Sequence, residues 1–185
     1  MDFVPLCIDI GRVSAHINPD LAIGLATQLP PTTDSFKENP KFLNIVQEVC
    51  SEFAHEDPDA KSQAQVMVSV AGANLNSGGV LSTGRNGRRR GDSSSGASGQ
   101  GGAGAGGRGG WIHVSDGRRP PDYGRIAWPE DMFGSLEVDS NGQFVGENGN
   151  YQPSGTYRIL TRDGIFGLSP FLREKLVQKL RELEK

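Results

Sequence analysis

The chain has 185 residues, a length that suits one domain or two very small ones. Hydrophobic residues make up 35% of the chain and aromatic residues 7%, which predicts that part of it does not fold into a core. The net charge of −3 argues against a dedicated nucleic-acid-binding domain, because such domains usually carry a strong basic surplus.

We recognise no targeting or membrane segment. Asp2 and Asp9 fit neither a signal peptide nor a transit peptide, and the apolar stretches are far shorter than the roughly 20 residues of a membrane helix. Cys7 and Cys50 lie in apolar surroundings, which predicts buried free thiols rather than a disulfide. We therefore expect a cytoplasmic or nuclear protein that makes no membrane contact.

Residues 1–76 are expected to form a small helical bundle of three or four helices. In this segment an Asn or Asp stands directly before a proline three times, at Asn18-Pro19, Asn39-Pro40 and Asp57-Pro58. Such a side chain can cap a helix whose first residue is proline, because that residue needs no N–H partner. We predict helices over 19–29, 40–54 and 58–71, and either a helix or a strand over 3–17.

The predicted helix over 40–54 has the clearest pattern. Its apolar residues recur at spacings of three and four, as they do on one face of a helix. They are Phe42, Ile45, Val46, Val49 and Phe53. Glu48 and Glu52 occupy the other side, so this helix is expected to bury one face.

Residues 77–110 are predicted to be a disordered linker. Of the 26 glycines, 14 lie between Gly78 and Gly110, and most of the other residues there are Ser and Arg. Such a composition cannot bury enough surface to offset its conformational entropy. The linker also contains five arginines that could contact RNA phosphates and bases: Arg85, Arg88, Arg89, Arg90 and Arg108.

Residues 111–185 are predicted to form a small antiparallel sheet with one terminal helix. We expect strands over 111–114 and 157–161, and a hairpin of 135–139 with 143–145 around an Asn141-Gly142 turn. Ser169-Pro170 begins the final helix. Its expected apolar stripe is Leu172, Leu176, Leu180 and Leu183. The fold class is therefore α+β, and the two ordered segments could share one core.

Two motifs lie between the predicted strand 111–114 and the predicted hairpin that starts at residue 135. Each has both a structural and a binding interpretation. Pro120-Pro121-Asp122-Tyr123 matches the pattern that WW domains read, but in the alternative interpretation the prolines stiffen the entry to the sheet while Tyr123 packs inward. The aromatic cluster Trp128, Met132 and Phe133 could form a contact surface. We favour the structural interpretation for both motifs, with Trp128 and Phe133 filling the core.

The sequence predicts no catalytic, cofactor or metal site. Ser elbows, P-loops and dinucleotide-binding glycine patterns are absent, and the three histidines are not clustered with other ligands. Our leading hypothesis is therefore a non-enzymatic adaptor, or a subunit of a larger assembly, with a protein as partner. One alternative is a weakly RNA-associated protein acting through the linker arginines. The other is a small enzyme with a site near His113 and Asp116.

Overall fold

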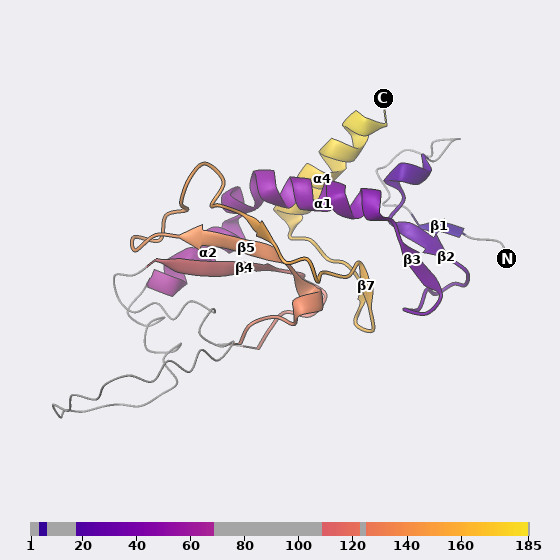
Figure 1. The fold of residues 1–185 in the computed structure, drawn as a ribbon, viewed down its shortest axis with the longest axis horizontal. Helices are drawn as coiled ribbons and strands as arrows, with labels where there is room; N and C mark the ends of the chain where they lie inside the picture. The colour runs from indigo at the N-terminus through magenta and orange to yellow at the C-terminus, as the bar shows by residue number, and fades with distance from the viewer. Residues whose placement is uncertain (1–3, 7–17, 69–108, 123–124, 185) are drawn as a thin grey trace.

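The structure is a computed structural model that describes residues 4–6, 18–68, 109–122 and 125–184 (Figure 1). Its α-helices are α1 (Pro40–Phe53), α2 (Pro58–Val68) and α4 (Pro170–Leu183). Its strands are β1 (Val4–Leu6), β2 (Gly24–Ala26), β3 (Phe36–Glu38), β4 (Gly110–Ser115), β5 (Met132–Val138), β6 (Gln152–Pro153), β7 (Leu160–Thr161) and β8 (Gly164–Ile165). Short 3-10 helices lie at Pro19–Leu21 (η1), Ala54–Glu56 (η2) and Pro129–Asp131 (η4). The α+β class is thus observed.

The predicted helix over 19–29 is wrong, and with it the purely helical bundle. Asn18 does cap a helical turn, because its Oδ1 accepts the N–H of Asp20 at 3.0 Å, but the turn ends at Leu21. The chain then enters β2, the central strand of the antiparallel sheet β1–β2–β3. A Cβ at Gly24 would lie 2.4 Å from the Phe36 ring, so glycine allows β2 and β3 to approach. Non-local strand pairing therefore overrides the local helix signal.

The other two helices of the first segment are confirmed. Asn39 caps α1 by accepting the N–H of Lys41 at 3.0 Å, and its amide donates to the carbonyl of Ala22 at 2.7 Å. The start of α1 is thereby tied to the segment that leads into β2. The residues of α1 that become fully buried are Phe42, Val46, Val49 and Cys50. Residues 69–71 of the predicted second helix lie outside the described residues.

A single pair of side chains joins the N-termini of α2 and α4. Asp57 is 3% exposed, and its Oδ1 accepts the N–H of Asp59 in the first turn of α2. Its Oδ2 accepts the hydroxyl of Ser169 at 2.5 Å, and the oxygen of Ser169 in turn accepts the N–H of Leu172 in α4. The two caps thus form one hydrogen-bonded chain, although they lie 112 residues apart.

The C-terminal sheet has the antiparallel order β4–β5–β6. The predicted strand over 111–114 is β4, and the predicted hairpin is present as a bridge between Val138 and Phe144 around Gly142, whose φ is 79°. The predicted strand over 157–161 is only partly correct. Leu160 and Thr161 alone form β7, which pairs with β8 in a separate two-stranded hairpin. The preceding backbone is instead engaged by a buried arginine that is described below.

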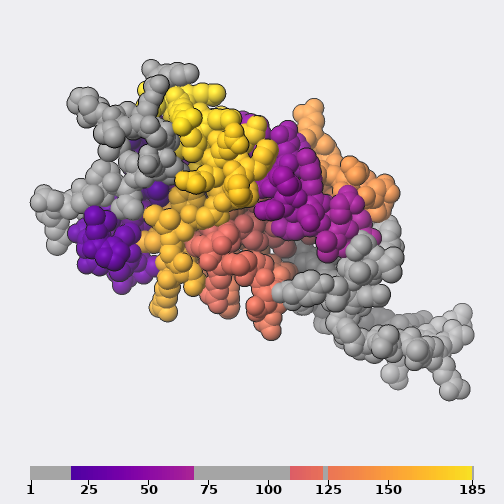
Figure 2. Space-filling model, turned by 180° about the vertical axis from the view of Figure 1, so that it is seen from behind, coloured from indigo at the N-terminus to yellow at the C-terminus, as the bar shows by residue number. Residues whose placement is uncertain are grey.

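Helix α4 begins where the sequence predicts, and Leu172, Leu176 and Leu180 are buried. Leu183 is 48% exposed, so the expected stripe ends one turn earlier than predicted. Lys179 reaches across to Glu48 of α1, with an N–O distance of 3.3 Å. Figure 1 shows α1 crossing the C-terminal sheet with the β1–β2–β3 sheet near its N-terminal end, and Figure 2, seen from behind, shows α4 lying against α1.

One cluster of buried side chains combines both segments of the sequence. Phe42 and Val46 of α1 belong to it together with Leu136 of β5 and Leu176 of α4. The predicted segment boundaries at 76 and 110 stay a prediction, because residues 77–108 lie outside the described part of the chain.

We predict that replacing Asp57 with alanine lowers the free energy of unfolding by about 2 kcal/mol. The variant loses a helix cap and leaves the Ser169 hydroxyl without its acceptor. Urea denaturation measures the change. Glu147→Ala removes an exposed carboxylate and should cost less than about 0.5 kcal/mol. Equal losses in the two variants would contradict the shared cap.

Cys50 is predicted to be unreactive while the protein is folded. Burial is the main reason that its pKa rises from 9.0 to about 12; a hydrogen bond with Tyr151 opposes this rise, and the charge of Asp57 adds a smaller increase. The folded state therefore keeps the thiol protonated, and any stability gained from this is lost as pH rises from about 9 toward 12. In a Cys7→Ser variant, labelling by a disulfide reagent near pH 8 should proceed only at the rate of unfolding. Rapid labelling of the native protein would contradict this.

Candidate functional site

Arg118 is a buried arginine at the centre of the second half of the chain. Its side chain is 3% exposed and lies between two buried carboxylates. Nε donates to Oδ1 of Asp131 at 2.7 Å and lies 3.5 Å from Oδ2 of Asp116. A guanidinium tolerates burial only when it is paired and its N–H groups are hydrogen-bonded, so this position demands arginine.

The remaining N–H groups of Arg118 hold backbone carbonyls. Nη1 donates to Ile159 at 3.0 Å and to Gly164 at 3.4 Å, whereas Nη2 donates to Arg158 at 2.7 Å and to Glu130 at 2.9 Å. One side chain thus fixes the β7–β8 hairpin against η4. This is why residues 157–159 do not continue as a regular strand.

Asp116 completes this buried cluster. Its Oδ1 accepts the N–H groups of Gly167 at 2.8 Å and Arg118 at 2.9 Å, and its Oδ2 accepts the Tyr157 hydroxyl at 2.7 Å. Burial, reinforced by the nearby Asp116 carboxylate, raises the pKa of Tyr157 far above its usual range. The phenol therefore remains a donor, and its ring stacks on Phe133 with centroids 4.3 Å apart.

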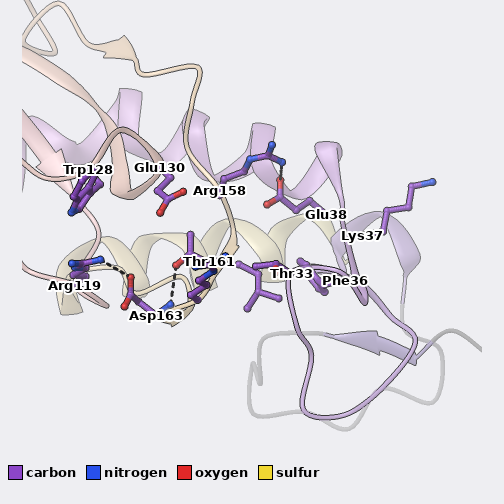
Figure 3. Close-up of a pocket in the computed structure, with 12 residues that line it drawn as sticks. Thr33, Phe36, Lys37, Glu38, Arg119, Trp128, Glu130, Arg158, Thr161 and Asp163 are labelled. Carbon is purple, nitrogen blue, oxygen red and sulfur yellow. Dashed lines mark hydrogen bonds and ion pairs between the residues drawn. The ribbon is translucent and has the colours of Figure 1, made fainter. Parts of the chain in front are cut away.

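An open cleft of about 880 Å³ lies next to this cluster (Figure 3). The β1–β2–β3 sheet contributes one wall, and η4 with the β7–β8 hairpin contributes the other. The lining residues are Thr33, Phe36, Lys37, Glu38, Arg119, Trp128, Glu130, Arg158, Leu160, Thr161, Arg162 and Asp163. The cleft therefore combines residues from both predicted segments of the sequence, from 33–38 and from 119–163.

Ion pairs lie at both ends of the cleft. Arg119 approaches Asp163 at 3.2 Å beside Trp128, and Arg158 approaches Glu38 at 3.9 Å at the other end (Figure 3). The other oxygen of Glu38 accepts the backbone N–H of Ile159 at 3.0 Å. The two contacts of Glu38 connect β3 to the segment before β7.

Trp128 is 60% exposed at the mouth of the cleft, so the prediction that it fills the core is wrong. It precedes Pro129 at the start of η4, and the guanidinium of Arg119 lies 5.8 Å from its ring centroid. A second hollow of about 370 Å³ adjoins the same tryptophan and includes Pro121 and Ile126 in its lining. The large ring is thus held at the boundary between two depressions.

The structure separates the other predicted contact residues. Pro120 and Pro121 are exposed, and Met132 is half-buried. Phe133 is 1% exposed and belongs to the core, as the structural interpretation predicted. It therefore cannot be part of a contact surface. Tyr123 and the arginines proposed for RNA contact lie outside the described residues. Those arginines are Arg85, Arg88, Arg89, Arg90 and Arg108.

His113 and Asp116 have different partners. The Nδ1 of His113 lies 2.8 Å from the hydroxyl oxygen of Ser135, and burial lowers the pKa of the ring. Asp116 belongs to the Arg118 cluster, and no hydrogen bond or ion pair joins it to His113 within the described part of the chain. Across those same residues, no group of three or more His, Cys, Asp or Glu could hold a metal ion.

Sequence reasoning missed the cleft because its walls are far apart in the chain. Glu38 and Ile159, which meet through a hydrogen bond, are separated by 121 residues. One local feature in the sequence could have pointed to this site. Arg118 and Arg119 are adjacent and precede two prolines, and the structure places the first side chain inside the protein and the second outside.

No family model, curated protein or solved structure matches this chain. Among the helices that the structure describes, none is long and apolar enough to span a membrane.

We predict that Arg118→Lys lowers the free energy of unfolding by about 3 kcal/mol. A lysine keeps the charge but cannot reach two carboxylates and four carbonyls at once. Urea denaturation gives the value, and Arg119→Lys is the matched control because its side chain is 51% exposed. The control should change stability by less than about 0.5 kcal/mol. A comparable effect of the two substitutions would argue against the buried cluster as the organising element.

Proposed function

We propose that this protein is a non-enzymatic adaptor that binds a partner protein through the surface around Trp128. The observation that carries the proposal is the 60% exposure of Trp128 between two hollows. Tryptophan is strongly enriched among the residues that dominate binding energy at interfaces, because its ring buries a large area at low entropic cost. An exposed tryptophan on a fixed backbone is suited to that role.

The neighbourhood of Trp128 supports this proposal. Ile126 is 48% exposed on the same loop, and Pro120 and Pro121 are exposed along the adjoining hollow. Arg119 stacks against the ring and remains half-exposed, so it can also bond to a partner. Apolar groups with a charged rim are typical of the centre and edge of a binding surface.

We predict that Trp128→Ala weakens partner binding by about thirtyfold, which corresponds to the loss of one hot-spot side chain. The tagged full chain is used to isolate a stoichiometric partner, whose purified form is then titrated against both proteins. Leu183→Ala is the matched control, because Leu183 is 48% exposed on α4 and lies outside both hollows.

The control variant should bind like the parent protein. A partner that binds the Trp128→Ala variant with unchanged affinity would disprove the proposed surface. Thermal unfolding of both variants should match the parent closely, since neither side chain belongs to the buried core: Trp128 is 60% exposed and Leu183 is 48% exposed.

A further inference from the structure

We propose that the partner protein carries a groove walled by aromatic rings, of the type found in WW domains, and that this groove binds the segment 119–122. The inference rests on the proposed function and names the chemical class of the partner. Three observations carry it: the exposure of two adjacent prolines, the free carbonyl groups of these prolines, and the anchoring of the segment at both of its ends.

The segment 119–122 is exposed along its whole length, and Pro120 and Pro121 form its centre. A proline ring fixes its own φ at about −65°, and a residue that precedes a proline is restricted to extended or polyproline conformations. Arg119 and Pro120 each precede a proline. The covalent structure therefore favours a polyproline II segment, which is the backbone form that aromatic grooves bind.

The backbone of the two prolines is available to a partner. Proline has no N–H group, so the carbonyl is its only backbone group that can form a hydrogen bond. Within the described part of the chain, no N–H or O–H group donates to the carbonyl of Pro120 or of Pro121. A polyproline II segment forms no internal hydrogen bonds, so these oxygens can accept from donors in a binding groove.

Contacts at both ends hold the segment in place. Arg118 directly precedes it, is 3% exposed and is fixed by the buried cluster. At the other end, the N–H of Arg125 donates to the carbonyl of Asp122 at 2.9 Å. Because these anchors already restrict the chain, little conformational entropy is lost when a groove binds the prolines. The prolines can thus stiffen the entry to the sheet and be recognised at the same time.

The spacing of the prolines indicates which type of groove fits. SH3 ligands typically contain two prolines that are separated by two residues, and this spacing is absent from 119–124. The pattern that WW domains read contains two adjacent prolines, as this segment does. Tyr123 completes that pattern in the sequence, but it lies outside the described residues and is not part of the inferred contact surface.

The hollow of about 370 Å³ connects the prolines to Trp128. Pro120, Pro121 and Trp128 all line it, together with Ile126, which is 48% exposed. A groove that is seated on the prolines therefore also borders the tryptophan on which the proposed function depends. Aromatic rings of the groove would pack on the proline rings, and the indole would extend the contact at the rim.

The experiment applies the labelled full chain to an array of purified WW and SH3 domains. WW domains should bind it, and SH3 domains should not. Fluorescence anisotropy then gives the affinity for a bound WW domain. Pro120→Ala and Pro121→Ala should each weaken this binding about tenfold or more, because alanine loses both the ring contact and the fixed backbone angle.

Pro170→Ala is the matched control, since Pro170 is an exposed proline at the first residue of α4 and lies outside the hollow. It should leave the affinity unchanged. Thermal unfolding should show that all of these proline variants remain folded, because the replaced rings are exposed. Replacing an aromatic residue in the groove of the bound WW domain with alanine should abolish binding.

The outcomes separate this inference from the proposed function. Failure of every WW domain to bind, while an isolated partner still requires Trp128, would overturn the aromatic groove and leave the adaptor proposal standing. WW binding that requires the prolines but is unaffected by Trp128→Ala would support the groove and contradict the surface around Trp128. WW binding that persists in both proline variants, or SH3 binding that requires the prolines, would also overturn the inference.

Discussion

The described C-terminal half depends on the burial of one guanidinium. Arg118 must be almost completely surrounded by acceptors, because a charge at 3% exposure has no water to stabilise it. It obtains them from Asp116, Asp131 and backbone carbonyls that come from separate parts of the chain. Each hydrogen bond to such an acceptor fixes the loop that carries it. Because Arg118 needs all of these acceptors, its burial determines the positions of η4 and the β7–β8 hairpin.

The exposed cleft is the outer side of this buried cluster. Arg118 points inward and Arg119 points outward, while Asp131 is buried three residues after the exposed Trp128. A binding surface whose backbone is already fixed loses less conformational entropy when a partner arrives. Under the proposed function, the buried ion pairs would contribute to recognition indirectly, by keeping the tryptophan and the cleft wall in place.

The sequence predicts those parts of the fold that depend on local signals. The caps Asn39 and Ser169, each followed by proline, correctly mark the starts of α1 and α4, and the glycine turn marks the hairpin. Asn18 gives the same signal but starts only one turn, because the next residues pair with β1 and β3. Neither that pairing nor the binding of distant carbonyls by Arg118 leaves a trace in local spacing, since β2 pairs with two other strands and the carbonyls of Arg158 and Ile159 lie 40 and 41 residues from Arg118.

The same non-local contacts explain why the candidate site requires residues from both predicted segments of the chain. Glu38 lies next to α1, whose cap Asn39 is hydrogen-bonded to the segment before β2. Its carboxylate accepts the N–H of Ile159, and the carbonyl of Ile159 is held by Arg118. A continuous series of hydrogen bonds thus runs from the N-terminal sheet through the cleft wall to the buried cluster. Because each wall is positioned by contacts with the other, the cleft is a property of the joint core rather than of either segment.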